Sequence, residues 1–404
     1  MKNKNQKVIV AGGGIGGLAV ALGLAELGLQ IVLIERAAEF KEIGAGIQLG
    51  PNAFAALDAL GAGESARARA VYTDHIIMKD AVDAKTIVKF ETSERFRERF
   101  GNPYGVIHRA DIHGSLLEQL ENKDNVELHP STEIVDYEET TEGVSVITAD
   151  GREFTGDILI GADGVRSVVR KKLLNDPVRV SGHVVYRAVV PQERMPEELR
   201  VNAPFLWAGP HCHLVHYPLR GGKEYNLVVT FHSREQEEWG SREGSREEVL
   251  SYFEGIHDMP AQLLDLPTSW MRWATADREP VEKWGSDRVQ ILGDAAHPMM
   301  QYMAQGACMA LEDAVTLAEA VREKNFNFKE AFALYESLRI PRTARVVWST
   351  REMGRIYHAK GIERQVRNGL WTHRAQEGFY DAITWLYSWD VNNCLKQSKD
   401  WQLK

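Results

Sequence analysis

Three glycines near the start of the chain have the spacing of a phosphate-binding turn. Gly12, Gly14 and Gly17 form the pattern Gly-x-Gly-x-x-Gly directly after the apolar run of residues 8–11. Glycine at these positions allows a tight turn, lets the backbone approach a pyrophosphate and permits close packing of a helix on a strand. Glu35 ends the next apolar run, where its carboxylate could accept hydrogen bonds from a ribose. The pattern predicts dinucleotide binding, and the alternative is an ordinary strand–helix turn.

Two later segments place polar groups at the ends of predicted strands. Asp163 lies in an Asp-Gly turn after one apolar run, and Asp294 follows another, where a carboxylate can bind a ribitol hydroxyl. A predicted helix then opens at Gly306 and Ala307, and its N-terminus could face a flavin pyrimidine, which gains negative charge on reduction. The glycine turn alone does not separate NAD from FAD, whereas these two segments favour FAD.

A third segment carries candidate proton-transfer groups. In a strand, His211, His213 and Tyr217 share one face, while Cys212 and His216 share the other. Histidine is the usual base near neutral pH, so His213 and Tyr217 are predicted to point into a cleft. A metal site is disfavoured because alternation divides the possible ligands between two faces. A packed, hydrogen-bonded core histidine stays open as the alternative for His213.

The surrounding sequence predicts the elements that must position these groups. Apolar residues at helical spacing follow the glycine turn, and a second buried strand spans residues 31–34, which gives a βαβ unit and a parallel sheet. Residues 176–280 contain alternating, strand-like runs with a hairpin turn at 220–223. The predicted fold is α/β: a Rossmann-like FAD-binding domain, an inserted antiparallel α+β substrate domain and a helical C-terminal segment.

The predicted domain boundaries follow from these changes of pattern. The FAD-binding domain is discontinuous and takes residues 1–72, 101–175 and 281–327, and the substrate domain takes residues 73–100 and 176–280. Residues 328–404 form the helical segment, which four tryptophans are expected to pack down: Trp348, Trp371, Trp385 and Trp389.

Composition excludes several classes of protein. The 404-residue chain has a net charge of −9, whereas general nucleic-acid binders need a basic surface. Its three cysteines are far apart without Cys-x-x-Cys spacing, which fits a reducing cytoplasm, the expected location. The sequence has no apolar run of 18 residues, so no membrane span is expected. No metal is expected either.

Taken in order, the glycine turn with Glu35, the Asp163 turn and the Asp294 segment resemble the single-component aromatic hydroxylases of the p-hydroxybenzoate hydroxylase fold. The resemblance covers nearly the whole chain. It implies bound FAD, and NADH, or alternatively NADPH, that visits without its own Rossmann domain. It also implies that Arg36 and Arg109 contact FAD, although on the residues alone each would be a surface ion pair. Gln48 is also expected to contact the cofactor.

Within this family, residues 209–222, 276–280 and 301–307 resemble the 3-hydroxybenzoate 6-hydroxylases, which make gentisate. The resemblance implies that reduced FAD and O2 form a C4a-hydroperoxide, which hydroxylates the ring para to the phenol. His213 would act as base or proton relay, Gln301 as partner of the phenol oxygen and Tyr217 as a donor that positions the carboxylate or ring. Tyr104 would line the substrate pocket.

The residues leave several alternatives open. The same chemistry could act on salicylate or on 6-hydroxynicotinate, but the sister 6-hydroxynicotinate hydroxylases are expected to carry histidines where Gln48 and Gln301 stand. Two neutral amides favour a benzoate-type phenol. Gln301 could also be an ordinary loop amide. A non-catalytic flavin-binding protein is the rival from another class, and a flavin halogenase would need a suitably placed lysine. The expected partners are a small aromatic acid, NADH and O2, and a homodimer is left open.

Overall fold

The computed structural model describes residues 6–41 and 45–396, and its glycine turn joins a parallel sheet to a helix. The sheet has the order β19-β12-β1-β2-β8, and every neighbouring pair is parallel. Its strands are short apolar runs, as expected for a parallel sheet buried on both faces. The expected βαβ beginning is confirmed, and distant segments complete the sheet: β1 (Lys7–Ala11), β2 (Gln30–Ile34), β8 (Val126–His129), β12 (Ile158–Gly161) and β19 (Val289–Ile291).

Helix α1 (Ile15–Glu26) is buried nearly all round. It packs against both α5 (Arg109–Leu120) and α9 (Gly306–Glu323). A helix that is apolar on every side needs such cover. This packing fixes the direction of α1 and therefore the place of the glycine turn that precedes it.

The second large element is an eight-stranded sheet of order β17-β18-β13-β16-β15-β14-β5-β6. All neighbours are antiparallel except β14 and β5, which run parallel. The expected antiparallel insertion is confirmed, and residues 75–91 join residues 179–277 in one sheet; the domain boundaries stay a prediction. The strands are β5 (His75–Asp80), β6 (Thr86–Glu91), β13 (Arg179–Pro191), β14 (Phe205–Gly209), β15 (Cys212–Leu219), β16 (Glu224–His232), β17 (Gly240–Gly244) and β18 (Trp270–Asp277).

Smaller elements complete the two halves. One antiparallel sheet contains β3 (Gly46–Leu49), β7 (Gly105–His108) and β4 (Val71–Tyr72), and another contains β9 (Ile134–Glu139), β10 (Val144–Thr148) and β11 (Glu153–Gly156). The short helices are α2 (Pro51–Ala59), α3 (Gly63–Arg69), α4 (Glu94–Phe100), α6 (Val168–Leu174), α7 (Arg246–Tyr252) and α8 (Asp258–Leu264).

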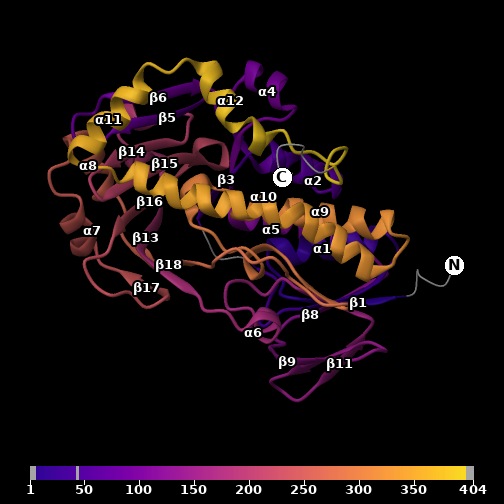
Figure 1. Cartoon of the computed structure of the whole chain (residues 1–404). Coiled ribbons are helices and arrows are strands. Elements are labelled where there is room, and N and C mark those ends of the chain that lie inside the picture. Colours follow the sequence, from indigo (N-terminus) through magenta and orange to yellow (C-terminus); the bar gives the residue numbers. More distant parts are fainter. Residues whose placement is uncertain (1–5, 42–44, 397–404) are drawn as a thin grey trace.

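The C-terminal segment is helical, as expected. The long α10 (Phe328–Tyr357) runs across the molecule beside α9, and α11 (Gly361–Thr372) and α12 (Gln376–Tyr387) continue over β6 (Figure 1). Trp389 is buried, but Trp348 is 55% exposed, so the expectation that it packs the segment down is wrong. In the part of the chain that the structure describes, no helix is both long and apolar enough to cross a membrane.

Candidate active site

A cavity of about 840 Å³ lies between the carboxyl ends of the parallel strands and one face of the eight-stranded sheet. This volume is within the usual range for ligand pockets, and open α/β sheets bind ligands at that edge. The cavity brings together most of the side chains predicted from the sequence: Gly14, Gln48, Tyr104, Arg109, His213, Tyr217, Asp294, Gln301, Gly306 and Ala307.

Gly12 and Gly17 do not line the cavity. They allow the backbone of the turn to approach the neighbouring backbone closely. Gly12 has a φ of +102°, and a Cβ there would lie 2.4 Å from the carbonyl oxygen of Ala162. A Cβ on Gly17 would lie 1.8 Å from the carbonyl oxygen of Gly12. Both positions therefore require glycine, since any side chain would push α1 away from β1 and β12.

Glu35 and Arg36 also lie outside the cavity lining. The Glu35 carboxylate accepts hydrogen bonds from the backbone N–H groups of Gly13, at 2.7 Å, and Ala37, at 2.8 Å. It thereby ties the glycine turn to the end of β2. Arg36 is exposed. Their roles as cofactor ligands stay predictions.

Asp163 organises the Asp-Gly turn from within. Its Oδ2 accepts the backbone N–H of Val168 at 2.7 Å, at the start of α6, and burial raises its pKa. Its buried Oδ1 has no hydrogen-bond partner among the described residues. Gly164, the next residue, lines the cavity. A direct contact between Asp163 and the cofactor stays a prediction.

The residues present fit an FAD molecule. Helix α1 begins after Gly14 and α9 begins after Gln305, and neither first turn has a side-chain cap. Both starts line the cavity. Uncapped backbone N–H groups and the positive end of the helix dipole favour phosphate or a reduced flavin ring. Arg109 adds positive charge to the wall, and Asp294 can accept polyol hydroxyls.

His213 lies at the cavity wall and is nearly fully buried. Its Nδ1 is 2.8 Å from Nε2 of His358, so Nε2 of His213 is the ring atom left for a ligand. Burial lowers the pKa of His213 to about 3, with a smaller contribution from His183. His213 is thus both a packed histidine and a cavity-lining group. His358 follows the last residue of α10, and no local pattern in the sequence pointed to it.

The predicted alternation along β15 is confirmed from His213 onward. Tyr217 lines the cavity, whereas Cys212 belongs to the apolar core on the other side and His216 stacks on Phe205 there, at 5.0 Å between ring centroids. His211 is the exception, since it lies in the exposed turn before the strand with a φ of +62°. Within the described ranges no group of three or more histidine, cysteine or acidic side chains could hold a metal.

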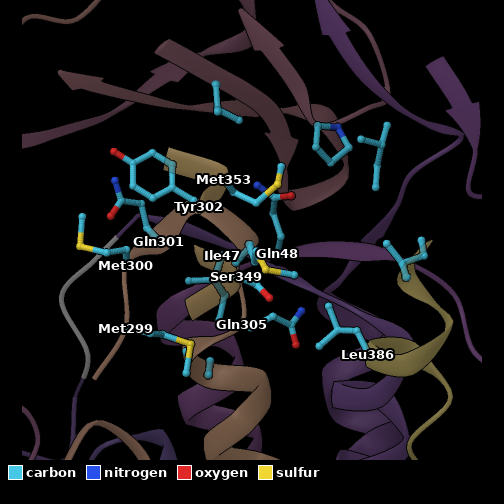
Figure 2. Close-up of a pocket in the computed structure, with 18 of the residues that line it drawn as sticks. Ile47, Gln48, Met299, Met300, Gln301, Tyr302, Gln305, Ser349, Met353 and Leu386 are labelled. Carbon is cyan, nitrogen blue, oxygen red and sulfur yellow. The ribbon is translucent and has the colours of Figure 1, made fainter. Parts of the chain in front are cut away.

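Three glutamines surround the pocket from three elements: Gln48 from β3, Gln301 from the loop after β19 and Gln305 from the start of α9 (Figure 2). Gln301 Nε2 donates to Oγ1 of Thr230 at 3.3 Å, and Thr230 is the register partner of His213. Gln301 is therefore held beside the pair that His213 and Thr230 form across β15 and β16.

Tyr104 and Asn52 fix the other two amides. The hydroxyl of Tyr104 donates to Oε1 of Gln48 at 2.7 Å, and burial raises the pKa of Tyr104 well above its ordinary value, so it stays a donor. Asn52 Nδ2 donates to Oε1 of Gln305 at 3.0 Å. Gln305 and Asn52 were not singled out from the sequence, because their pairing joins residues 253 positions apart.

Comparison with known proteins defines the class. Residues 5–392 match the FAD binding domain family. The chain belongs to the family of FAD-dependent aromatic hydroxylases, and it is an FAD-dependent monooxygenase.

Individual relatives narrow the resemblance. The chain is 64% identical to 3-hydroxybenzoate 6-hydroxylase from Klebsiella oxytoca, over 97% of this chain and 99% of the relative. It is 60% identical to the enzyme of the same name from Polaromonas naphthalenivorans (strain CJ2), over 96% and 97%. Among solved structures, a salicylate hydroxylase substrate complex is 27% identical with a TM-score of 0.83, over 98% of both chains.

Proposed function

We propose that this monooxygenase hydroxylates 3-hydroxybenzoate para to its hydroxyl group and yields gentisate, with NADH as reductant and O2 as oxidant. The observation that carries the proposal is that Gln301 is hydrogen-bonded to Thr230, the register partner of His213, so that both side chains line the cavity that also receives the uncapped starts of α1 and α9. The identity of 64% to a 3-hydroxybenzoate 6-hydroxylase supports the substrate.

When bound, FAD supplies an acceptor for the hydride of NADH and the activation of O2. The protein must make the aromatic ring electron-rich, which it can do by removing the phenol proton. His213 Nε2 takes that proton, and His213 Nδ1 passes its own proton to Nε2 of His358. Burial keeps the pKa of His213 near 3 and lowers that of His358 well below its ordinary value, so neither ring retains the proton and the pair acts as a relay that passes it on. The expected hydroperoxide route stays a prediction.

Gln301 positions the phenol oxygen. One N–H of its amide is used by Thr230, so the second N–H can donate to the phenolate that forms. This donor stabilises negative charge on oxygen without carrying a charge itself. Gln48, held by Tyr104, presents a second neutral amide to the cavity. Two amides suit a benzoate-type phenol better than a pyridinol.

The test is a substrate panel with the holoenzyme. NADH consumption, O2 uptake and product identity are measured with 3-hydroxybenzoate, salicylate and 6-hydroxynicotinate, and NADPH replaces NADH in a parallel series. NADH oxidation is expected to be slow alone and to accelerate most with 3-hydroxybenzoate. A clear advantage for salicylate or 6-hydroxynicotinate would overturn the substrate, and no stimulation by any phenol would overturn the proposed function.

A further inference from the structure

Arg187, in β13, is a cation at the cavity wall for which the described residues provide no acidic partner. It lines the cavity, and its buried Nε has no hydrogen-bond partner. Among the described residues no carboxylate forms an ion pair with it, and its Cζ lies 5.6 Å from the centroid of the Trp273 ring. Buried charges in proteins are normally paired, because desolvation is costly.

The electrostatic surroundings of Arg187 favour an anion. Burial lowers the pKa of Arg187, and the charge of the neighbouring Arg109 lowers it further, while Tyr217 acts in the opposite direction. Tyr217 is itself a neutral phenol, whose pKa burial raises far above neutrality. The wall here therefore joins two positive groups and a hydroxyl donor, which is the usual composition of a carboxylate site.

Sheet register places Arg187 at a fixed offset from His213. Arg187 pairs with Val228 of β16, and Val228 pairs with Val215 of β15, the residue midway between His213 and Tyr217. Neighbouring strands lie about 4.8 Å apart, so the Cα atoms of Arg187 and Val215 are separated by about 10 Å. His213 lies about 7 Å along β15 from Val215. All these side chains line the same cavity.

We propose that Arg187 binds the carboxylate of the aromatic substrate, with the ring lying over Val215 and Val228 and the hydroxyl directed to His213. This inference rests on the proposed function. The two valines form an apolar floor, and the row of His213, Thr230 and Gln301 lies on one side of it. A ring with its two substituents meta to each other spans these two polar ends. Arg187 is thereby a specificity-determining residue.

Arg187 could instead bind a phosphate of a dinucleotide, because phosphate and carboxylate both present anionic oxygens. The uncapped start of α1 and Arg109 already offer donors for phosphate. Arg187 lies on the sheet face that carries His213, which favours the substrate. The experiment separates the two sources, since a phosphate role would alter the retention of FAD or the KM for NADH.

The test compares Arg187→Met and Arg187→Lys with the wild-type holoenzyme, and Arg194→Met, an exposed residue near the end of β13, is the matched control. Two ligands are titrated and followed by the flavin absorbance: 3-hydroxybenzoate and the neutral 3-hydroxybenzyl alcohol. Arg187→Met should raise the Kd of 3-hydroxybenzoate by about 10- to 100-fold, the loss expected for a charge-assisted hydrogen bond. The Kd of the alcohol should change by less than about 3-fold. Arg187→Lys should lie between, since it keeps the charge but loses the planar fork.

The outcomes are distinguishable. Equal losses for both ligands would show a structural role and overturn the proposal, as would an unchanged Kd for 3-hydroxybenzoate with weaker FAD retention or a higher KM for NADH. If Arg187→Met does not fold, the same ligand comparison with Arg187→Lys decides. If the wild-type protein binds neither ligand, the proposed function is wrong. If the wild-type protein binds normally and the variants lose no more affinity for 3-hydroxybenzoate than for the alcohol, only the role of Arg187 is wrong.

Discussion

The pairing of His213 with His358 makes a quantitative prediction for a residue that lies behind the pocket wall. His358→Phe removes the acceptor of the His213 Nδ1 proton, and His358→Gln keeps a hydrogen-bonding group there but not a relay. Both variants should slow hydroxylation while flavin reduction by NADH stays within a few-fold of the wild-type rate.

Both rings of this pair are weak bases. Burial lowers the pKa of His213 to about 3, and burial with the neighbouring histidines lowers the pKa of His358 well below its ordinary value. The loss in rate is therefore set by the proton path that His358 provides, not by the pKa of His213. General acid–base assistance usually contributes about 10²–10⁴-fold, and water that enters the cavity would reduce the loss. We therefore expect hydroxylation to be slower by about 10²–10⁴-fold or less.

The assay is rapid mixing of reduced holoenzyme with O2 and 3-hydroxybenzoate, together with the gentisate-to-NADH and H2O2-to-NADH ratios. In the variants H2O2 should replace gentisate, and gentisate formation should recover as pH rises, because hydroxide then removes the phenol proton. His216→Gln is the matched control, since His216 is also buried but lies on the opposite face of β15, stacked on Phe205. It should cost stability and leave the ratios unchanged. Normal rates and ratios in both His358 variants would refute the relay.

Three further predictions follow from the site and its supports. His213→Ala and Gln301→Ala should slow hydroxylation by about 10²–10⁴-fold or less and raise H2O2 per NADH, with FAD retained; a normal product-to-NADH ratio beside a lowered melting temperature would show a purely structural role. Gly14→Val should give folded protein with little FAD, judged by flavin absorbance after gel filtration, and full occupancy would contradict the assigned turn. Asp313, buried in α9, lies 2.5 Å from Nε2 of His297 and accepts a hydrogen bond from Nε of Arg339 at 2.6 Å. Burial raises the pKa of Asp313, but His297 and Arg339 hold it at about 2, so its stabilisation is complete above about pH 4 and is lost as pH falls through about 2. Asp313→Asn should therefore cost about 3–5 kcal/mol at pH 7, and urea unfolding at stepped pH should show this difference shrinking between pH 4 and 2; a constant difference would contradict the assignment.

The parts of the site that the sequence predicted depend on local geometry. The period of two along a strand placed His213 and Tyr217 on one face. The glycine turn between strand and helix followed from steric demands that Gly12 and Gly17 meet within a few residues. Apolar runs and their spacing likewise predicted the parallel sheet and the antiparallel insertion, because those patterns reflect burial on two faces or on one.

The parts that the sequence did not predict depend on long-range packing. His358 reaches His213 only because the long α10 crosses the molecule and carries it to β15 (Figure 1). Arg187 lies on the same sheet face as His213 because β13, β16 and β15 are neighbours in the sheet, and no local sequence pattern predicts that strand order. His211 was placed wrongly by a local pattern. The predicted strand was extended too far, because His211 lies in the exposed turn before β15.

The identity of the oxygenated product tests the proposed reaction directly. The holoenzyme is incubated with 3-hydroxybenzoate, NADH and ¹⁸O2, and the product is analysed by chromatography and mass spectrometry. We expect gentisate that carries one ¹⁸O atom, in an amount close to the NADH consumed. A different dihydroxybenzoate, or NADH oxidation that yields only H2O2, would contradict the proposed reaction.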